Sequence, residues 1–286
     1  NQKEENMEFL DKFFHIKARG SNITAEVIGG VVTFLAMVYI LPVNSFMLAN
    51  AGMSQPGVFV ATALAAGFAT ILMGVLGKVP IALASGMGIN AFFTFTVVIS
   101  LQFTWQEALA AVFVSGILFL IVSVTGLRKL IINAIPKGLK LAIGAGIGFF
   151  IAFIGLKNAG IIIADPFGTY VTLGDLSHPT VLLAVFGIVL VLVLFTIGGK
   201  IGRFAIIIAM LATGFIGIVL GALFGGLDGL MPTLTISNLG DIGEVGGLFG
   251  QAFGALGSLL GNPLAYPVII TFLFIDFFDT SGTLVS

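Results

Sequence analysis

Long apolar runs dominate the chain, and short polar segments separate them. The runs cover approximately residues 27–48, 57–76, 81–100, 108–125, 139–156, 181–197, 204–224 and 263–286. Each could cross a hydrocarbon layer of ~30 Å as an α-helix, because a helix rises ~1.5 Å per residue. The pattern therefore predicts an all-α polytopic membrane protein with seven complete transmembrane spans and the start of an eighth. We expect the chain to be an N-terminal fragment, because its last residues lie inside a span.

The basic residues indicate how the spans are oriented. All Lys and Arg residues except Lys157 fall in the N-terminal segment or in alternate loops. Loops on the cytoplasmic side carry an excess of these residues. We therefore expect a multi-pass protein of the cell membrane with a cytoplasmic N-terminus. Residues 7–16 show apolar side chains at helical spacing, which fits either a surface helix or a solvated lead-in.

The composition agrees with a membrane protein and limits the kinds of functional site that the chain can hold. Hydrophobic residues make up 58% of the chain and charged residues 9%, against about 25% charged in soluble domains. The chain has no Cys and two His, which excludes disulfides and thiolate metal sites and leaves little for any other metal site. We expect no cofactor. The net charge of −1 and the lack of a basic aromatic patch argue against nucleic-acid binding.

Two carboxyl groups interrupt the last apolar run. Asp276 and Asp279 are three residues apart, so both lean toward one face of a helix. A carboxylate at the centre of a span costs about 2.5–3.5 kcal/mol on insertion scales. We therefore expect this face to line a polar cavity, where a carboxyl group binds a substrate or takes up and releases a proton. An alternative for Asp279 is to cap the unpaired amides of a broken helix.

A second polar interruption lies in the third run. Pro80, Gly86 and Gly88 predict that this span is broken, and Asn90 then stands at the start of its second half. Broken spans expose backbone amides that hold polar ligands in transporters. The alternative is that the glycines only permit close helix packing. In the first span, Pro42 predicts a kink, and a bond from Asn44 to a neighbouring helix is favoured over a role in binding.

Three motifs resemble one transporter family. They are residues 86–93 (GMGINAFF), residues 132–136 with 142–148 (INAIP and AIGAGIG), and residues 271–285 (TFLFIDFFDTSGTLV). Together they are similar to the azaguanine-like purine permeases, the hypoxanthine, guanine and adenine permeases of the nucleobase:cation symporter-2 group. The resemblance runs from about residue 13 to the end of the chain.

The resemblance implies an inverted repeat of seven plus seven spans, divided into core and gate domains. Residues 1–26 would form a cytoplasmic segment, 27–125 core spans one to four, 126–225 gate spans five to seven, 226–262 an extracellular Gly-rich loop with a candidate interfacial helix, and 263–286 the start of core span eight. A further acid and backbone strand of the site, from a tenth span, would lie beyond Ser286.

The same resemblance implies a function and its residues. The protein would import a purine base (hypoxanthine, guanine or adenine) by alternating access with proton coupling. Sodium is the alternative coupling ion, and a homodimer is compatible with this. The substrate-binding residues would be Asp276, Asn90, Gly88, Asp279 and Phe92, and Asp276 and Asp279 would couple the proton. Three alternatives stay open at this point: an anion or other small-solute carrier of the same architecture, a channel, and a membrane-embedded acid hydrolase.

Overall fold

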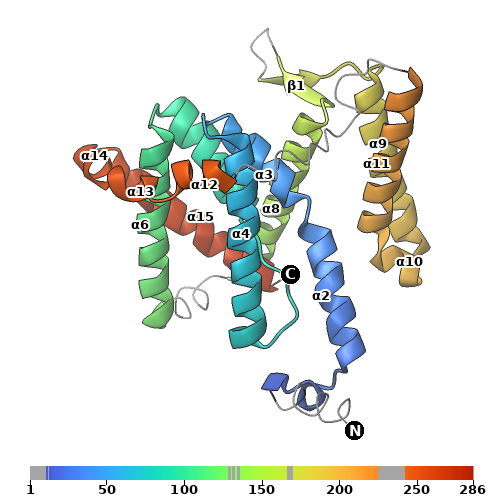
Figure 1. The fold of residues 1–286 in the computed structure, drawn as a ribbon, viewed down its shortest axis with the longest axis horizontal. Coiled ribbons are helices and arrows are strands. Elements are labelled where there is room, and N and C mark those ends of the chain that lie inside the picture. Colours follow the sequence, from blue (N-terminus) through green and yellow to red (C-terminus); the bar gives the residue numbers. More distant parts are fainter. Residues whose placement is uncertain are drawn as a thin grey trace. The chain divides into compact units, whose positions relative to one another are not determined.

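The first span begins at a polar N-cap residue and is interrupted by a turn just before a proline. The computed structural model describes residues 11, 13–127, 130, 133, 136–165, 170–224 and 242–285. Helix α2 (Ile23–Met37) begins after Asn22, whose side chain accepts the Ala25 N–H. Helix α3 starts at Ile40 and ends at Ala49. Pro42 has no N–H to donate to the carbonyl of Val38, which accepts from Leu41 N at 3.2 Å instead. The expected kink therefore appears as a turn between α2 and α3 (Figure 1).

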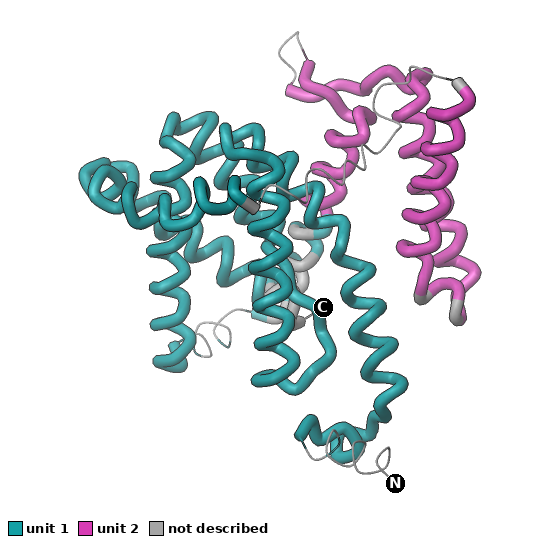
Figure 2. The backbone as a smooth tube through the Cα atoms, in the orientation of Figure 1, with its two compact units in different colours: residues 1–148, 236–286 teal, residues 149–235 magenta. Residues whose placement is uncertain are grey.

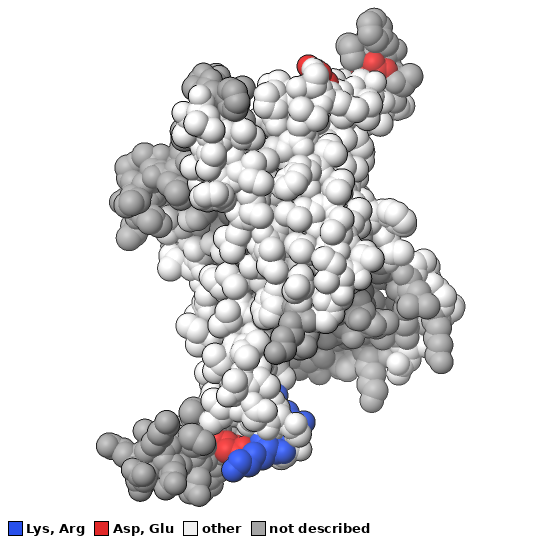
Figure 3. All heavy atoms as spheres, turned by 90° about the vertical axis from the view of Figure 1, so that its right-hand side faces the viewer, with Lys and Arg blue, Asp and Glu red and all other residues white. Residues whose placement is uncertain are grey.

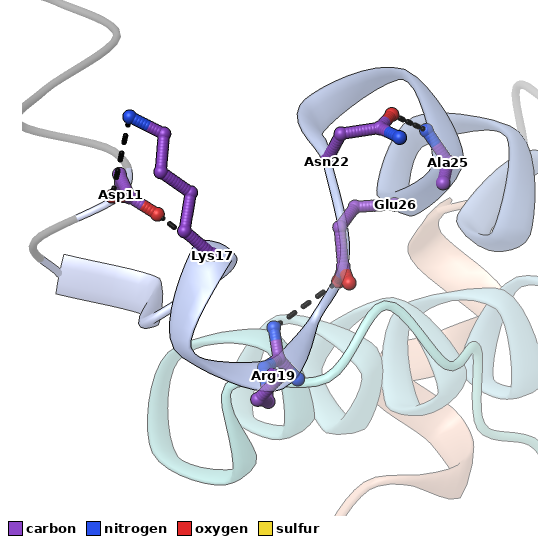
Figure 4. Close-up of polar contacts among 6 residues, drawn as sticks. All are labelled: Asp11, Lys17, Arg19, Asn22, Ala25 and Glu26. Atoms are coloured by element: carbon purple, nitrogen blue, oxygen red, sulfur yellow. Dashed lines mark hydrogen bonds and ion pairs between the residues drawn. The ribbon is translucent and has the colours of Figure 1, made fainter.

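The segment before α2 is held by charged contacts at the surface (Figure 4). After a 3-10 turn at Lys17–Arg19, Arg19 Nη2 lies 3.2 Å from Glu26 Oε2. Asp11 accepts the Lys17 N–H at 2.8 Å and lies 3.8 Å from Lys17 Nζ. Exposed ion pairs of this kind are worth less than about 1 kcal/mol. Half of the expected surface helix over residues 7–16 lies outside the described residues.

The next helices correspond closely to the apolar runs of the sequence. Helix α4 (Gln55–Leu72) is capped by Ser54 and runs into a π-helical turn, Met73–Gly77. After an extended segment come α5 (Met87–Ala91) and the π-helix η3 (Phe92–Ser100). Helix α6 (Trp105–Val124) starts with a capping box, in which Thr104 accepts the Glu107 N–H and Glu107 accepts the Thr104 N–H.

The remaining elements are α8 (Lys137–Asn158), β1 (Ile162–Ala164), β2 (Val171–Leu173), α9 (Pro179–Ile197), α10 (Gly199–Arg203), α11 (Ala205–Phe224), α12 (Ile242–Leu248), α13 (Gln251–Gly254), α14 (Leu256–Gly261) and α15 (Ala265–Val285). Strands β1 and β2 form an antiparallel hairpin with Ile163 opposite Thr172. Much of the Gly-rich loop expected over residues 226–262 falls outside the described residues, and its described part forms α12, α13 and α14.

The chain divides into two compact units, Asn1–Gly148 with Ile236–Ser286, and Phe149–Thr235 (Figure 2). In the first unit, α15 packs along α6, where Ala108, Ala111 and Ala265 are fully buried. Small residues allow such close approach of helices in membranes. Helices α13 and α14 also pack on α6, and they bury Leu259 in the same core as Phe272.

In the second unit, α9 packs against α11. A Cβ at Gly187 of α9 would lie 3.0 Å from Thr213 Oγ1 of α11, so the absence of a side chain at Gly187 allows the close crossing. The outward faces of both helices are apolar, as the exposed Leu192, Phe195 and Phe215 illustrate. In the view of Figure 3 the helix faces carry no coloured charged side chain, and the Lys and Arg in view lie by the N-terminal segment.

Among the described residues, five helices are long and apolar enough to cross a membrane: Ile23–Ala49, Gln55–Gly77, Trp105–Val124, Pro179–Ile197 and Ala205–Leu223. Met87–Ser100 and Gly148–Asn158 are shorter apolar helices. The mostly helical architecture with many apolar exposed faces confirms a polytopic membrane protein.

Candidate functional site

The third apolar run is not helical from its start. The turn after α4 ends at Lys78, which has a left-handed backbone (φ 56°). Pro80, which cannot donate a backbone hydrogen bond, follows, and residues 80–86 contain no helix. The helix then begins at Met87 with Gly86 as its extended N-cap (φ −72°, ψ 126°). The predicted break is therefore present, with an extended segment before the half-helix.

The eighth run brings its second carboxyl group to this break. A Cβ built at Gly86 would collide with Oδ2 of Asp279. One turn earlier on α15, Ile275 Cγ2 lies 3.5 Å from the Cβ position of Gly88. The missing side chain at Gly86 therefore allows the Asp279 carboxyl group to approach the start of the half-helix closely, whereas a Cβ at Gly88 would make only an ordinary van der Waals contact with α15. This contact lies within the first compact unit.

Asp276 belongs to the same side of α15 by helical spacing. It stands four residues after Phe272, which packs against Phe92, and three residues before Asp279, which reaches Gly86. Both Asp276 and Asp279 are half-buried. The Asp276 carbonyl accepts the Thr280 hydroxyl at 2.7 Å, a bond within the helix.

Asn90 is buried, with 8% of its surface exposed. Its Nδ2 donates to the Ser85 Oγ at 3.2 Å, so the amide bridges the first turn of the half-helix back to the extended segment. The structure thus brings Asn90, Ser85, Gly86 and Asp279 into one neighbourhood. Sequence reasoning had not selected Ser85, although its position beside Gly86 was a signal.

The phenylalanines near the break serve mainly to pack helices together. Phe92 and Phe272 lie edge to face, with centroids 4.9 Å apart, and Phe272 is fully buried. Phe93 and Phe277 are 2% and 4% exposed. Phe92 is thus seated against α15 at the same break, and only part of its surface is available to other contacts.

Asn44, another polar residue of the spans, has a partner on a neighbouring helix. Asn44 Nδ2 donates to Thr62 Oγ1 at 2.8 Å, which links α3 to α4 and confirms the interpretation of Asn44 as a residue that bonds a neighbouring helix. Within the described part of the chain, no group of three or more His, Asp or Glu residues is placed to hold a metal ion.

Comparisons with known proteins identify the family of the chain. The chain matches the profile of the Permease family over residues 24–285. It is 44% identical to the guanine/hypoxanthine permease PbuG of Bacillus subtilis (strain 168), across 97% of this chain and 62% of that protein. It is 41% identical to the guanine/hypoxanthine permease PbuO of the same organism, across 95% and 60%. The adenine permease AdeQ of Escherichia coli (strain K12) is 36% identical, across 96% and 58%. The chain thus spans about three fifths of these curated relatives' length.

Proposed function

Because the chain belongs to the Permease family, we propose that its complete protein imports purine nucleobases, namely hypoxanthine, guanine or adenine, with proton coupling and by alternating access. The relatives that carry this proposal are named as guanine/hypoxanthine and adenine permeases. The structural observation that supports it is the approach of Asp279 to Gly86, which joins the acidic face of α15 to the break in the third span.

The chemistry of this neighbourhood fits a purine base. Such a base is flat and neutral, and its edge carries both hydrogen-bond donors and acceptors. Asp276 would bond this edge from α15, while Asn90 and the bare backbone at Gly88 would line the other side. Phe92 would offer apolar contact at the rim. Asp279, which reaches the N-terminus of the half-helix, would hold the geometry of the site.

Either carboxyl group could carry the coupled proton. A carboxyl group can take up and release a proton, and a proton-coupled carrier requires this of at least one group. Asp276 and Asp279 are both half-buried on one side of α15, and the described charged residues lie mostly toward the helix ends. Substrate and proton would therefore meet on the same helix face.

The wider organisation follows as part of the same proposal. Residues 27–125 and 263–286 would form core spans, residues 126–225 gate spans, and the seven complete spans one half of an inverted repeat. The separate compact unit at Phe149–Thr235 supports this division. The N-terminus would face the cytoplasm of a cell-membrane protein, as the distribution of Lys and Arg suggests.

A competition experiment tests the proposal. The complete protein is expressed in cells that lack their own purine uptake, and labelled hypoxanthine is offered with excess adenine, guanine, xanthine or uracil at two pH values. We expect saturable uptake that purines inhibit, uracil does not, and an inward proton gradient accelerates. Uptake that no purine inhibits would overturn the substrate class, and uptake that is insensitive to the proton gradient would overturn the coupling.

A further inference from the structure

The backbone N–H groups of the extended segment, residues 80–86, make no hydrogen bonds within a helix. Within a membrane protein such groups must find partners in the protein or in a water-filled cavity, since each unsatisfied group costs several kcal/mol in hydrocarbon. The structure gives two successive amides of this segment partners from two different helices. In both cases the partner is the hydroxyl group of a threonine.

Thr33 of α2 holds the segment from one side. Its Oγ1 accepts the Ala82 N–H at 3.2 Å and donates to the Gly30 carbonyl at 3.0 Å, and the Pro80 carbonyl lies 3.5 Å away. The turn of α2 before it has no side chains at Gly29 and Gly30, where Cβ atoms would lie 3.8 and 3.7 Å from the Pro80 ring. The Pro80 ring therefore packs against the surface of α2 where side chains are missing. This packing places the Ala82 N–H next to the Thr33 hydroxyl.

Thr70 of α4 holds the segment from the other side. Its Oγ1 accepts the Leu83 N–H at 2.9 Å and lies 3.4 Å from the Leu83 carbonyl, to which it donates. Leu83 thus exchanges both of its backbone hydrogen bonds with one hydroxyl group, as it would with an opposite residue in an antiparallel sheet. Successive amides of an extended chain point in opposite directions, which explains why Ala82 turns to α2 and Leu83 to α4.

We propose that Thr33 and Thr70 are positioning residues of the purine site, which act by clamping the extended segment between α2 and α4. The inference rests on the proposed function, because it concerns the same site. Leu83 is three residues from Gly86, where the segment meets Asp279. The backbone of residues 82–86 is extended. A shift of the backbone at residues 82 and 83 therefore also displaces residues 84–86.

The clamp depends on the hydroxyl groups, which distinguishes it from ordinary packing. Valine has nearly the shape of threonine but cannot replace its hydrogen bonds. Serine keeps the hydroxyl group and loses only a methyl group. Thr196 of α9 provides a matched control. Its hydroxyl donates to the Leu192 carbonyl of its own helix at 2.8 Å and, among the described residues, forms no hydrogen bond to another helix or loop.

The test compares Thr33→Val, Thr70→Val, Thr33→Ser, Thr70→Ser and the control Thr196→Val in the complete transporter. Purine affinity is measured together with membrane abundance, and hydrogen–deuterium exchange is followed at residues 82 and 83. Each valine variant should lower the affinity roughly tenfold, the effect of leaving a partly buried amide unsatisfied. Exchange should rise chiefly at Ala82 for Thr33→Val and chiefly at Leu83 for Thr70→Val. Both serine variants should restore affinity and protection.

The possible results separate the two proposals. If the unaltered protein takes up no purine, the proposed function fails. If it transports purine and the valine variants bind it as well as Thr196→Val does, the clamp is wrong. Serine variants that lose as much affinity as the valine variants would also overturn it, because packing would then be responsible. If a valine variant does not reach the membrane, alanine at that position removes the hydroxyl group without crowding and takes its place in the comparison.

Discussion

Oδ2 of Asp279 occupies the space in which a Cβ of residue 86 would stand. Glycine at residue 86 therefore permits this contact between α15 and the broken span, since the extended backbone there (φ −72°, ψ 126°) is one that any residue adopts. At Gly88, two residues later, the atom nearest to a Cβ would be Ile275 Cγ2 at 3.5 Å, which is an ordinary van der Waals distance. The two glycines of the motif thus serve different needs.

Replacing Gly86 with alanine should displace the Asp279 carboxyl group from the start of the half-helix. The new methyl group would meet the end of the Asp279 side chain, which must turn away into its packed surroundings, and overpacking of this kind costs about 1–3 kcal/mol. We expect Gly86→Ala to lower the thermal midpoint in detergent and to abolish purine uptake. Gly88→Ala should leave the midpoint nearly unchanged. Gly116→Ala on α6, where no atom lies within 4 Å of the Cβ position, should change neither measurement. Equal midpoints for the two variants at residues 86 and 88 would contradict this assignment.

The role proposed for Asp276 predicts a loss of uptake without a loss of protein. Asp276→Asn keeps the size of the side chain and removes its charge and its titratable proton. Hydrogen bonds to charged groups contribute about 1.5–3 kcal/mol, so uptake should fall at least tenfold at unchanged membrane abundance. The control is Asp175→Asn, in an exposed turn where Ser177 bonds the carboxylate. Normal uptake by Asp276→Asn would remove Asp276 from the site.

The bond between Asn44 and Thr62 should behave as a coupled pair. Thr62→Val leaves the Asn44 amide group, which is 4% exposed, without its partner and should destabilise the protein by about 1–3 kcal/mol. Replacing both residues, as Asn44→Leu with Thr62→Val, removes the polar groups together and should be less damaging than the sum of the two single changes. Thermal unfolding of the four proteins measures the coupling, and strict additivity would show that the bond does not link α3 to α4 energetically.

Ser54 should matter more than an ordinary helix cap. Its Oγ accepts the Gly57 N–H at 3.3 Å and donates to the Glu244 carboxylate of α12. Ser54→Ala removes the cap of α4 and its link to α12, so we expect a destabilisation of about 1–2 kcal/mol in thermal unfolding. Ser100→Ala, at an exposed serine bonded to the Phe95 carbonyl, should change stability by less than about 0.5 kcal/mol. A similar effect of the two changes would show that the link to α12 contributes nothing.

Much of the helical framework could be predicted from the apolar runs. The run at residues 181–197 became α9 (Pro179–Ile197), and that at 204–224 became α11 (Ala205–Phe224). Such runs are nearly continuous in membrane proteins, so their ends are marked by polar or turn-forming residues. The family predicted from three motifs is confirmed by the Permease match and by the purine permeases among the relatives.

The partners of the broken segment could not be predicted in the same way. Pro80 and Gly86 indicated where regular helix would stop, but no local pattern tells which helices then receive the freed amides. Thr33 and Thr70 are single hydroxyl groups in long apolar runs. Thr271 begins the same Thr-Phe-Leu sequence as Thr33, yet its hydroxyl donates to the Pro267 carbonyl of its own helix. Their roles follow from tertiary contacts, which sequence spacing does not encode.

The turn at Val38 and Tyr39 gives the first span two independent attachments. The part before the turn, α2, carries Thr33 and is fastened to the irregular backbone of the third span. The part after the turn, α3, carries Asn44 and is fastened to α4. The two parts of the first span are thus anchored to different neighbours. A change that removes the Thr33 contact would release α2 from the third span and leave the bond between α3 and α4 in place.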